Sequence, residues 1–304
     1  YRICSHPVSV AARRAVYSRR VLWQRKLERN VMKNLVFATA ALAVLSTAAT
    51  AHAQDSDWTG AYVGAHAGWG WQTKNDSETI TFDNNLDGNF NNTVNTSTGA
   101  NAFSPGFCGG AAASSVPAGG CSEEDGGFEF GGRLGYDWQF GPFVVGALIE
   151  GSRTNVEDSV AGFSTTPAQY TMTRKLKTLG AIRARGGYAF GDNLIYATGG
   201  VAQGEVKHSF NTTNTANTFR LTDDDKASGY QWGGGFERKI TPEVTLGVEY
   251  LYTNLEDDGF VVRAAGPAAA TNPFLIANGN GADFRRGEED FEVHSVRVTA
   301  SYRF

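Results

Sequence analysis

Apolar or small residues alternate strictly with polar or glycine residues over residues 128–140, which have the sequence FEFGGRLGYDWQF. A period of two indicates a β-strand, because successive side chains of a strand point to opposite faces. The same alternation predicts seven further strands. The eight expected strands span residues 58–71, 128–140, 143–151, 176–190, 194–207, 229–240, 244–255 and 294–304. The pattern therefore predicts an all-β fold.

The connections between these strands alternate strictly between long and short. The short ones lie near residues 141–142, 191–193 and 241–243, and the long ones span about 72–127, 152–175, 208–228 and 256–290. This asymmetry is typical of outer-membrane barrels, which have short periplasmic turns and longer extracellular loops. Closure of the sheet also leaves no strand edge exposed to lipid. We therefore predict an eight-stranded antiparallel transmembrane β-barrel of up-and-down topology, with four long extracellular loops and three short periplasmic turns.

The charged residues of the strands share one face, opposite the aromatic and aliphatic residues. If the apolar face meets lipid, the lumenal charges are Glu129, Arg133, Asp137, Arg183, Arg185, Glu237, Glu249 and Arg297, with Arg303 in the same phase. A soluble, lipocalin-like barrel would invert this arrangement, and alternation alone does not say which face is inward. The loop asymmetry, the aromatic strand ends and an export signal favour the membrane barrel.

Aromatic residues cluster near the ends of the expected strands. They are Trp58, Tyr136, Trp138, Phe140, Phe143, Tyr188, Phe190, Tyr196, Tyr250, Tyr252, Tyr302 and Phe304. Because amphipathic rings settle at the membrane–water interface, we expect these residues to form girdles around the barrel.

Composition separates the N-terminus from the remainder of the 304 residues. Residues 1–53 carry a net charge of +8, whereas residues 54–304 carry −12. Residues 32–53 have a basic start, a short apolar core and a small-x-small site, so we predict a signal peptide cleaved between Ala53 and Gln54. Residues 1–31 are expected to be upstream or non-native sequence; a twin-arginine signal and a nucleic-acid-binding arm are the alternatives. Residues 54–304 form the expected barrel domain, whose acidity argues against binding to nucleic acid.

The two cysteines of the first long loop, Cys108 and Cys121, flank a flexible stretch that is rich in glycine, alanine and serine. An exported compartment is oxidising, so we predict a disulfide between them.

Four acidic triplets lie close to the loop ends of the strands, at residues 123–125, 223–225, 256–258 and 288–290. Carboxylates at a membrane rim either solvate the loops or share divalent cations with lipid phosphates; we favour solvation and predict no metal site. Residues 89–101 and 264–281 are rich in small and polar residues and are expected to be mobile or disordered.

No phosphate-binding loop, zinc-ligand spacing or nucleophile elbow is present in the sequence. His294 and Ser295 are adjacent, so they point to opposite faces of a strand and cannot pair. We predict no enzymatic activity, no catalytic residues and no cofactor.

Several motifs resemble opacity-type outer-membrane barrels, the alphaproteobacterial surface antigens often called porin-family proteins. They are WTGAYVG at 58–64, RARGGYA at 183–189, LIYATGG at 194–200, Glu249-Tyr250 and the terminal SYRF. The resemblance covers about residues 58–304. It implies an eight-stranded barrel of the Gram-negative outer membrane with surface loops. The terminal Phe304, with Tyr302 two residues before it, is similar to the signal that such proteins present to the barrel assembly machinery.

The resemblance implies no single activity, because members are credited with adhesion, envelope integrity or ligand capture. At eight strands the interior is just wide enough for side chains to fill it, so we expect no general diffusion channel. We expect a structural and interaction role as a surface antigen, with outer-membrane lipid, lipopolysaccharide and host or cell-surface ligands as partners. The alternative is a small-solute porin or a barrel that captures a ligand such as haem.

Overall fold

The computed structural model describes residues 57–73, 77–122 and 126–304. The expectations for residues 1–31, for the signal peptide at 32–53 and for cleavage between Ala53 and Gln54 therefore lie outside the described residues. Within the described ranges, no helix has both the length and the apolar character needed to cross a membrane.

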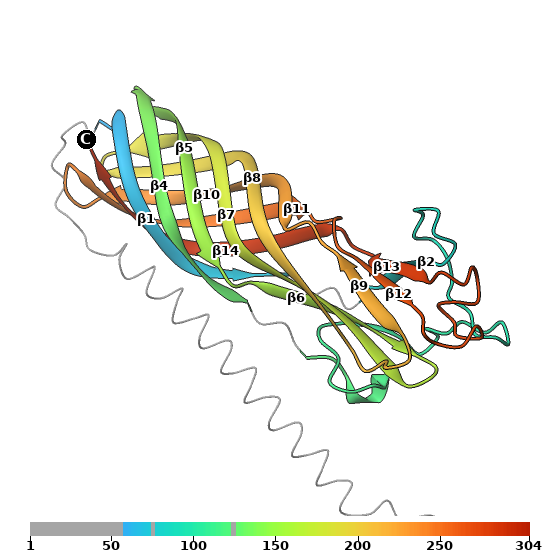
Figure 1. Ribbon diagram of the computed structural model, residues 1–304. Coiled ribbons are helices and arrows are strands. Elements are labelled where there is room, and N and C mark those ends of the chain that lie inside the picture. Colours follow the sequence, from blue (N-terminus) through green and yellow to red (C-terminus); the bar gives the residue numbers. More distant parts are fainter. Residues whose placement is uncertain (1–56, 74–76, 123–125) are drawn as a thin grey trace, which may run out of the picture. The chain divides into compact units, whose positions relative to one another are not determined.

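Eight strands form a closed antiparallel barrel, as the sequence pattern predicted (Figure 1). Each barrel strand pairs with its neighbours in chain order, and pairing of β7 with β8 and of β1 with β14 completes the cylinder. The barrel strands are β1 (Gly60–Trp71), β4 (Gly127–Phe140), β5 (Phe143–Thr154), β7 (Ala168–Phe190), β8 (Asn193–Thr212), β10 (Lys226–Lys239), β11 (Val244–Glu256) and β14 (Asp290–Arg303). Short turns join β4 to β5, β7 to β8 and β10 to β11, and we call this end of the barrel the turn end.

The charged face of the strands is the inward one. In β4, Phe130 and Leu134 are 51% and 53% exposed, whereas Glu129 and Arg133 are 4% and 2% exposed. The same alternation runs through β14, where Val298 is exposed and Arg297 is buried. Apolar side chains exposed all around the outer wall are unfavourable in water and favourable in hydrocarbon, so this wall suits a lipid bilayer.

Exposed aromatic residues form two bands around this wall. Those near the turn end are Tyr136, Trp138, Phe140, Phe143, Tyr188, Phe190, Tyr302 and Phe304. Those nearer the loop end are Trp69, Trp71, Phe128, Phe130, Tyr230, Trp232 and Tyr250, with the half-buried Tyr252. The girdle prediction is wrong for Trp58 and Tyr196, which are buried inside the barrel. Trp58 precedes β1, and Tyr196 occupies an inward-facing position of β8. Both residues lie near a strand end, but that position does not determine whether a side chain points outward or inward.

The long loops fold into a second structure, which we call the cap. It contains a four-stranded sheet in the order β2 (Ile80–Asp83), β13 (Ala282–Arg286), β12 (Val261–Ala265) and β9 (Thr218–Thr222). It also contains β3 (Gly106–Gly109) and β6 (Glu157–Ser164), which add to the part of β7 beyond the barrel, and a short 3-10 helix at Pro117–Gly119. The loop strands were not predicted, because most of them have only four or five residues and pair with segments distant in sequence; the eight-residue β6 instead forms a hairpin with the start of β7.

The cap has its own hydrophobic core. Its buried residues are Ile80, Phe82, Val94, Ala102, Phe103, Val160, Ala168, Tyr170, Met172, Phe260, Val262, Ala264, Phe274, Ala282 and Phe284. The ring of Phe284 lies 5.8 Å from that of Phe82 and 6.3 Å from that of Tyr170. The expectation of mobile loops at 89–101 and 264–281 is therefore wrong, because Val94 and Phe274 anchor these segments in the core.

Candidate functional site

The turn end of the lumen is closed by a buried tryptophan. Trp58 is fully buried and packs with Val144, Ala189, Leu194 and Tyr196. The charged groups of Lys239 and Arg303 each lie 5.1 Å from its ring centroid, and the Arg303 guanidinium donates a hydrogen bond to its carbonyl oxygen. Cation–π contacts of this kind hold a large ring across the opening.

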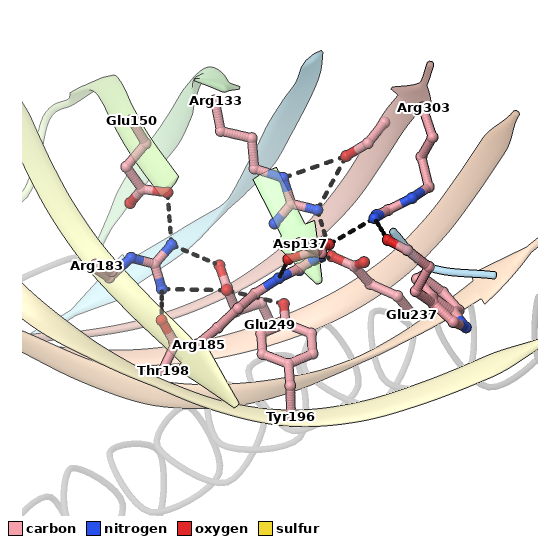
Figure 2. Close-up of polar contacts among 12 residues, drawn as sticks. Arg133, Asp137, Glu150, Arg183, Arg185, Tyr196, Thr198, Glu237, Glu249 and Arg303 are labelled. Atoms are coloured by element: carbon pink, nitrogen blue, oxygen red, sulfur yellow. Dashed lines mark hydrogen bonds and ion pairs between the residues drawn. The ribbon is translucent and has the colours of Figure 1, made fainter. Parts of the chain in front are cut away.

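Beyond Trp58 lies a first group of buried ion pairs (Figure 2). Arg185 pairs with Asp137 and also donates to Glu237 at 3.0 Å. Arg133 donates to the same Glu237 oxygen at 2.6 Å, and Arg303 donates to Asp137 at 2.6 Å. The five side chains come from β4, β7, β10 and β14, so they tie strands together across the lumen.

A second group of ion pairs lies next to the first. Arg183 and Arg297 share Glu150, at 2.7 and 2.6 Å, and both also contact Glu249. Arg297 reaches Glu129 at 3.1 Å, and the Tyr196 hydroxyl donates to Glu249 at 2.9 Å. Arg183 and Arg297 thus each face at least two carboxylates, which is the geometry that offsets the cost of burying charge.

All eight lumenal charges predicted from the sequence lie in these two groups, where five arginines face five acidic side chains. Glu150 and Arg303 complete the set. Glu150 was overlooked, although it shares its strand phase with the buried Val144 and Leu148 and could have been found from that phase. The equal numbers make these two groups together electrically neutral.

An apolar layer follows toward the loop end. It consists of Val156, Leu176, Leu179, Ala181, Ala202, Val206, Ala227, Leu255, Phe291 and Val293. These side chains occupy the inward positions of six neighbouring segments. They form a continuous apolar plug across the barrel, between the ion pairs and the loop end. A hydrated solute would have to cross both layers to pass through.

Above this plug, a third buried cluster joins the barrel to the cap, and we call it the neck cluster. Its members are Glu78, Asp158, Arg174, His208, Asp257 and Arg286. Asp158 accepts hydrogen bonds from Arg174 and Arg286, both at 2.7 Å. Glu78 and Arg286 lie on cap segments, whereas Arg174 and His208 lie on the loop-end extensions of the barrel strands β7 and β8, and Arg174 also donates to the carbonyl oxygen of Asp290 on β14. These contacts join the cap to the barrel.

His208 holds three segments together. Its Nδ1 lies 2.6 Å from Asp223, its Nε2 lies 2.9 Å from Asp257, and its ring stacks on Phe260 at 4.7 Å. Arg174 stands opposite it on β7 and lies 3.6 Å from Asp257. A neutral imidazole has only one N–H, so both carboxylates are satisfied only when His208 is protonated. Burial lowers the pKa of His208, but the hydrogen bonds and charges of Asp257 and Asp223 outweigh it and raise the pKa above 6.5.

This arrangement predicts a cap whose attachment weakens as the pH rises. Protonation of His208 stabilises the folded state, because the pKa of His208 is higher there than in the unfolded chain. This stabilisation is fully present below pH 6.5, the ordinary pKa of histidine, and is lost as the pH rises through the folded-state pKa. Hydrogen exchange of cap amides in vesicle-reconstituted protein, from about pH 5.5 to about pH 8.5, checks this. We expect protection to fall with pH in the wild type and to fall less steeply in His208→Gln, where Glu78, whose pKa burial raises to about 7, still contributes. His294→Gln, on the outer wall, should keep the wild-type slope; an unchanged slope in His208→Gln would contradict the assignment.

The structure joins Cys108 and Cys121 in a disulfide, at the base of a hairpin that runs through the 3-10 helix. Thirteen positions separate the two cysteines. The tip is exposed and has no buried side chain in its helical turn, so the hairpin depends on the bond and on the hydrogen bonds beside it, such as Ala113 to Gly120.

Replacing both cysteines by serine is expected to lower the stability of this hairpin by about 3 kcal/mol, the entropy of closing a loop of that size. Limited proteolysis of the reconstituted double variant should cut first between positions 108 and 121, while the barrel keeps its wild-type unfolding transition. Equal protease resistance in the variant and the wild type would show that the bond adds nothing.

The acidic triplets do not assemble a metal centre in the part of the chain that is described. No group of three or more His, Cys, Asp or Glu side chains there has the arrangement of a metal site. Residues 123–125 lie outside the description. Asp223 and Asp257 belong to the contacts of His208, so the triplets have structural partners as well as solvent-exposed members.

Comparison with known proteins identifies the family. A family model described as an outer membrane protein beta-barrel domain matches residues 37–304. The chain belongs to this family. The 31 kDa outer-membrane immunogenic protein of Brucella melitensis is 32% identical to it over 181 residues, 59% of this chain and 67% of the relative. The 22 kDa outer membrane protein of Rhizobium leguminosarum bv. viciae is 30% identical over 135 residues, 44% of this chain and 56% of the relative.

Among solved structures, the outer membrane protein OprG from Pseudomonas aeruginosa superimposes with a TM-score of 0.44 at 10% identity, covering 81% of this chain and 97% of that one. The family expected from the sequence motifs is confirmed, and this outer-membrane beta-barrel protein is located in the outer membrane of a Gram-negative bacterium. Its turn end accordingly faces the periplasm and its cap faces outward. The small-solute porin or ligand-capture alternative is not favoured.

Proposed function

We propose that the protein acts through its cap, as a surface antigen with a structural and interaction role in the cell envelope. The observation that carries this proposal is the cap's own core, since loops that only joined strands would not need one. A rigid outer surface of this kind suits recognition by host or cell-surface ligands, because little ordering entropy is lost on binding. The name of the Brucella relative, an immunogenic protein, points in the same direction.

The proposal includes no enzymatic activity and no cofactor, and the relatives' names as outer membrane proteins support it. We also propose that Tyr302 and Phe304 address the chain to the barrel assembly machinery. Both rings are exposed on the outer wall, at 47% and 77%, and they contact each other at 5.1 Å.

Epitope tags test the surface role directly. A tag inserted between Pro117 and Gly119 should be labelled by antibody on intact cells, whereas a tag at the Gly141–Pro142 turn should be labelled only after permeabilisation. Purified protein in vesicles should also give no swelling in isotonic sugar. Labelling of the turn tag on intact cells, or swelling at the rate of a general porin, would contradict the proposal.

A further inference from the structure

The outward-facing basic residues are concentrated in one sector of the barrel wall. All five lysines among the described residues lie on the neighbouring strands β7, β8 and β10, four of them toward the loop end, and Arg153 lies beside these four on β5. We call Arg153, Lys175, Lys177, Lys207 and Lys226 the basic sector. On the other side of the barrel, the outward charges at this level of β11 and β14 are acidic: Glu256, Asp290 and Glu292.

The side chains of the basic sector point away from the lumen. Arg153 is exposed and has the phase of Ile149, and Lys207 has the phase of Val201. Lys226 likewise continues the exposed face of Tyr230 and Trp232. Lys175 alternates with the buried Arg174 and Leu176, while Lys177 lies at the irregularity where the register of β7 and β8 shifts.

The register places this sector at the outer membrane boundary. Arg153, Thr178, Glu205 and Lys226 form one row across β5, β7, β8 and β10. Arg153 lies ten residues beyond Phe143, where β5 begins. At about 3.3 Å per residue and a tilt of about 40°, this is about 25 Å along the barrel axis, the height of the apolar band of such barrels. The four lysines lie thirteen to fifteen residues from their turns, so by the same measure they emerge about 8–13 Å farther out, on the headgroup side of this band.

Two lysines of the basic sector repel each other. Lys175 and Lys207 are directly opposite each other in the ladder, an arrangement of like charges that destabilises a sheet. Glu157 pairs with Lys175 at 2.7 Å, Glu205 is in register with Lys226, and the exposed Asp224 and Asp225 directly precede Lys226. Lys175 and Lys207 still face each other in the ladder, and an anion supplied from outside the protein would relieve the repulsion between them.

The predominance of lysine over arginine indicates which kind of anion the basic sector would bind. The two lumenal groups of ion pairs use arginine throughout, where fixed bidentate geometry is needed, whereas the basic sector is mostly lysine. A lysine ammonium is a compact charge on a flexible stem, which suits phosphates that move laterally in a leaflet. We propose that the basic sector binds the phosphorylated headgroups of outer-leaflet lipid. This inference rests on the outer-membrane location and is independent of the proposed role of the cap.

The test is titration of the folded full-length protein, in a neutral detergent, with diphosphoryl lipid A. We expect binding that weakens as salt is raised from about 50 mM to about 300 mM, since exposed charges are screened. The combined variant K175Q/K207Q/K226Q should bind about a hundredfold more weakly, at about tenfold for each 1.4 kcal/mol and about 1 kcal/mol for each lysine at an anionic surface. K175R/K207R/K226R, which keeps the charges, should bind within about threefold of wild type.

Three outcomes would overturn the proposal: wild-type affinity in K175Q/K207Q/K226Q, equal binding of dephosphorylated lipid A, or displacement of the lipid by inorganic phosphate at matched phosphate concentration. The matched control E256Q/D290N/E292Q changes three charges on the acidic side and should leave affinity unchanged. Heat-modifiable mobility in electrophoresis verifies that each variant is folded. If the triple variant does not fold, the single variants K207Q and K226Q should each lose about fivefold.

Discussion

Replacing Glu249 by glutamine is expected to lower the free energy of unfolding by about 3–5 kcal/mol, the usual cost of leaving buried charges without a partner. Glu249 contacts Arg183, Arg297 and the Tyr196 hydroxyl, and its side chain is fully buried. Glutamine keeps the shape of the side chain but removes the negative charge that both guanidinium groups face. Equilibrium unfolding in urea, with the protein in lipid vesicles, measures the loss.

Glu256→Gln is the matched control for this experiment, because Glu256 lies on the same strand but is exposed on the outer side. Its unfolding free energy should stay within about 0.5 kcal/mol of wild type. If Glu249→Gln were as stable as this control, the lumenal ion pairs would not contribute to holding the barrel closed.

Placing an arginine on the lipid face should also be costly. Leu134 is 53% exposed in the middle of β4, and Leu221 is 52% exposed on β9 of the cap. In vesicles, Leu134→Arg is expected to lose about 2–4 kcal/mol, because a charge at the centre of the bilayer is poorly solvated. Leu221→Arg, which faces water, should change stability by less than about 0.5 kcal/mol.

The comparison works because the two leucines have nearly the same exposed fraction and differ only in what surrounds them. Unfolding curves of both variants in the same vesicles give the two losses of unfolding free energy to be compared. Similar destabilisation at the two positions would mean that the wall of β4 is not in contact with hydrocarbon.

The barrel wall could be predicted from the sequence because its two faces meet very different surroundings at every second residue. The alternation of inward and outward positions alone places Arg133 inward and Leu134 outward. It would also have placed Glu150 and Tyr196 inward. Trp58 lies before β1 in the structure, but within the expected strand 58–71 it has the same phase as the buried Tyr62, so phase would have placed it inward as well.

The cap could not be predicted by the same reasoning. Residues 80–83 pair with residues 283–286, about two hundred positions away, and a four-residue strand is too short to show a period. The neck cluster combines Glu78 and Arg286 with Asp158 in the same long-range manner. Its members have no local pattern, because only the folded loops bring them together.

The central claim is that the exposed apolar residues of the barrel face hydrocarbon while the cap faces water. Spin labels at Val298→Cys and Leu221→Cys, which replace side chains that are 53% and 52% exposed, test it in lipid vesicles. The account predicts that the label at 298 is relaxed strongly by oxygen and weakly by a water-soluble nickel chelate, and that the label at 221 shows the reverse. Strong relaxation by the nickel chelate at position 298 would contradict it.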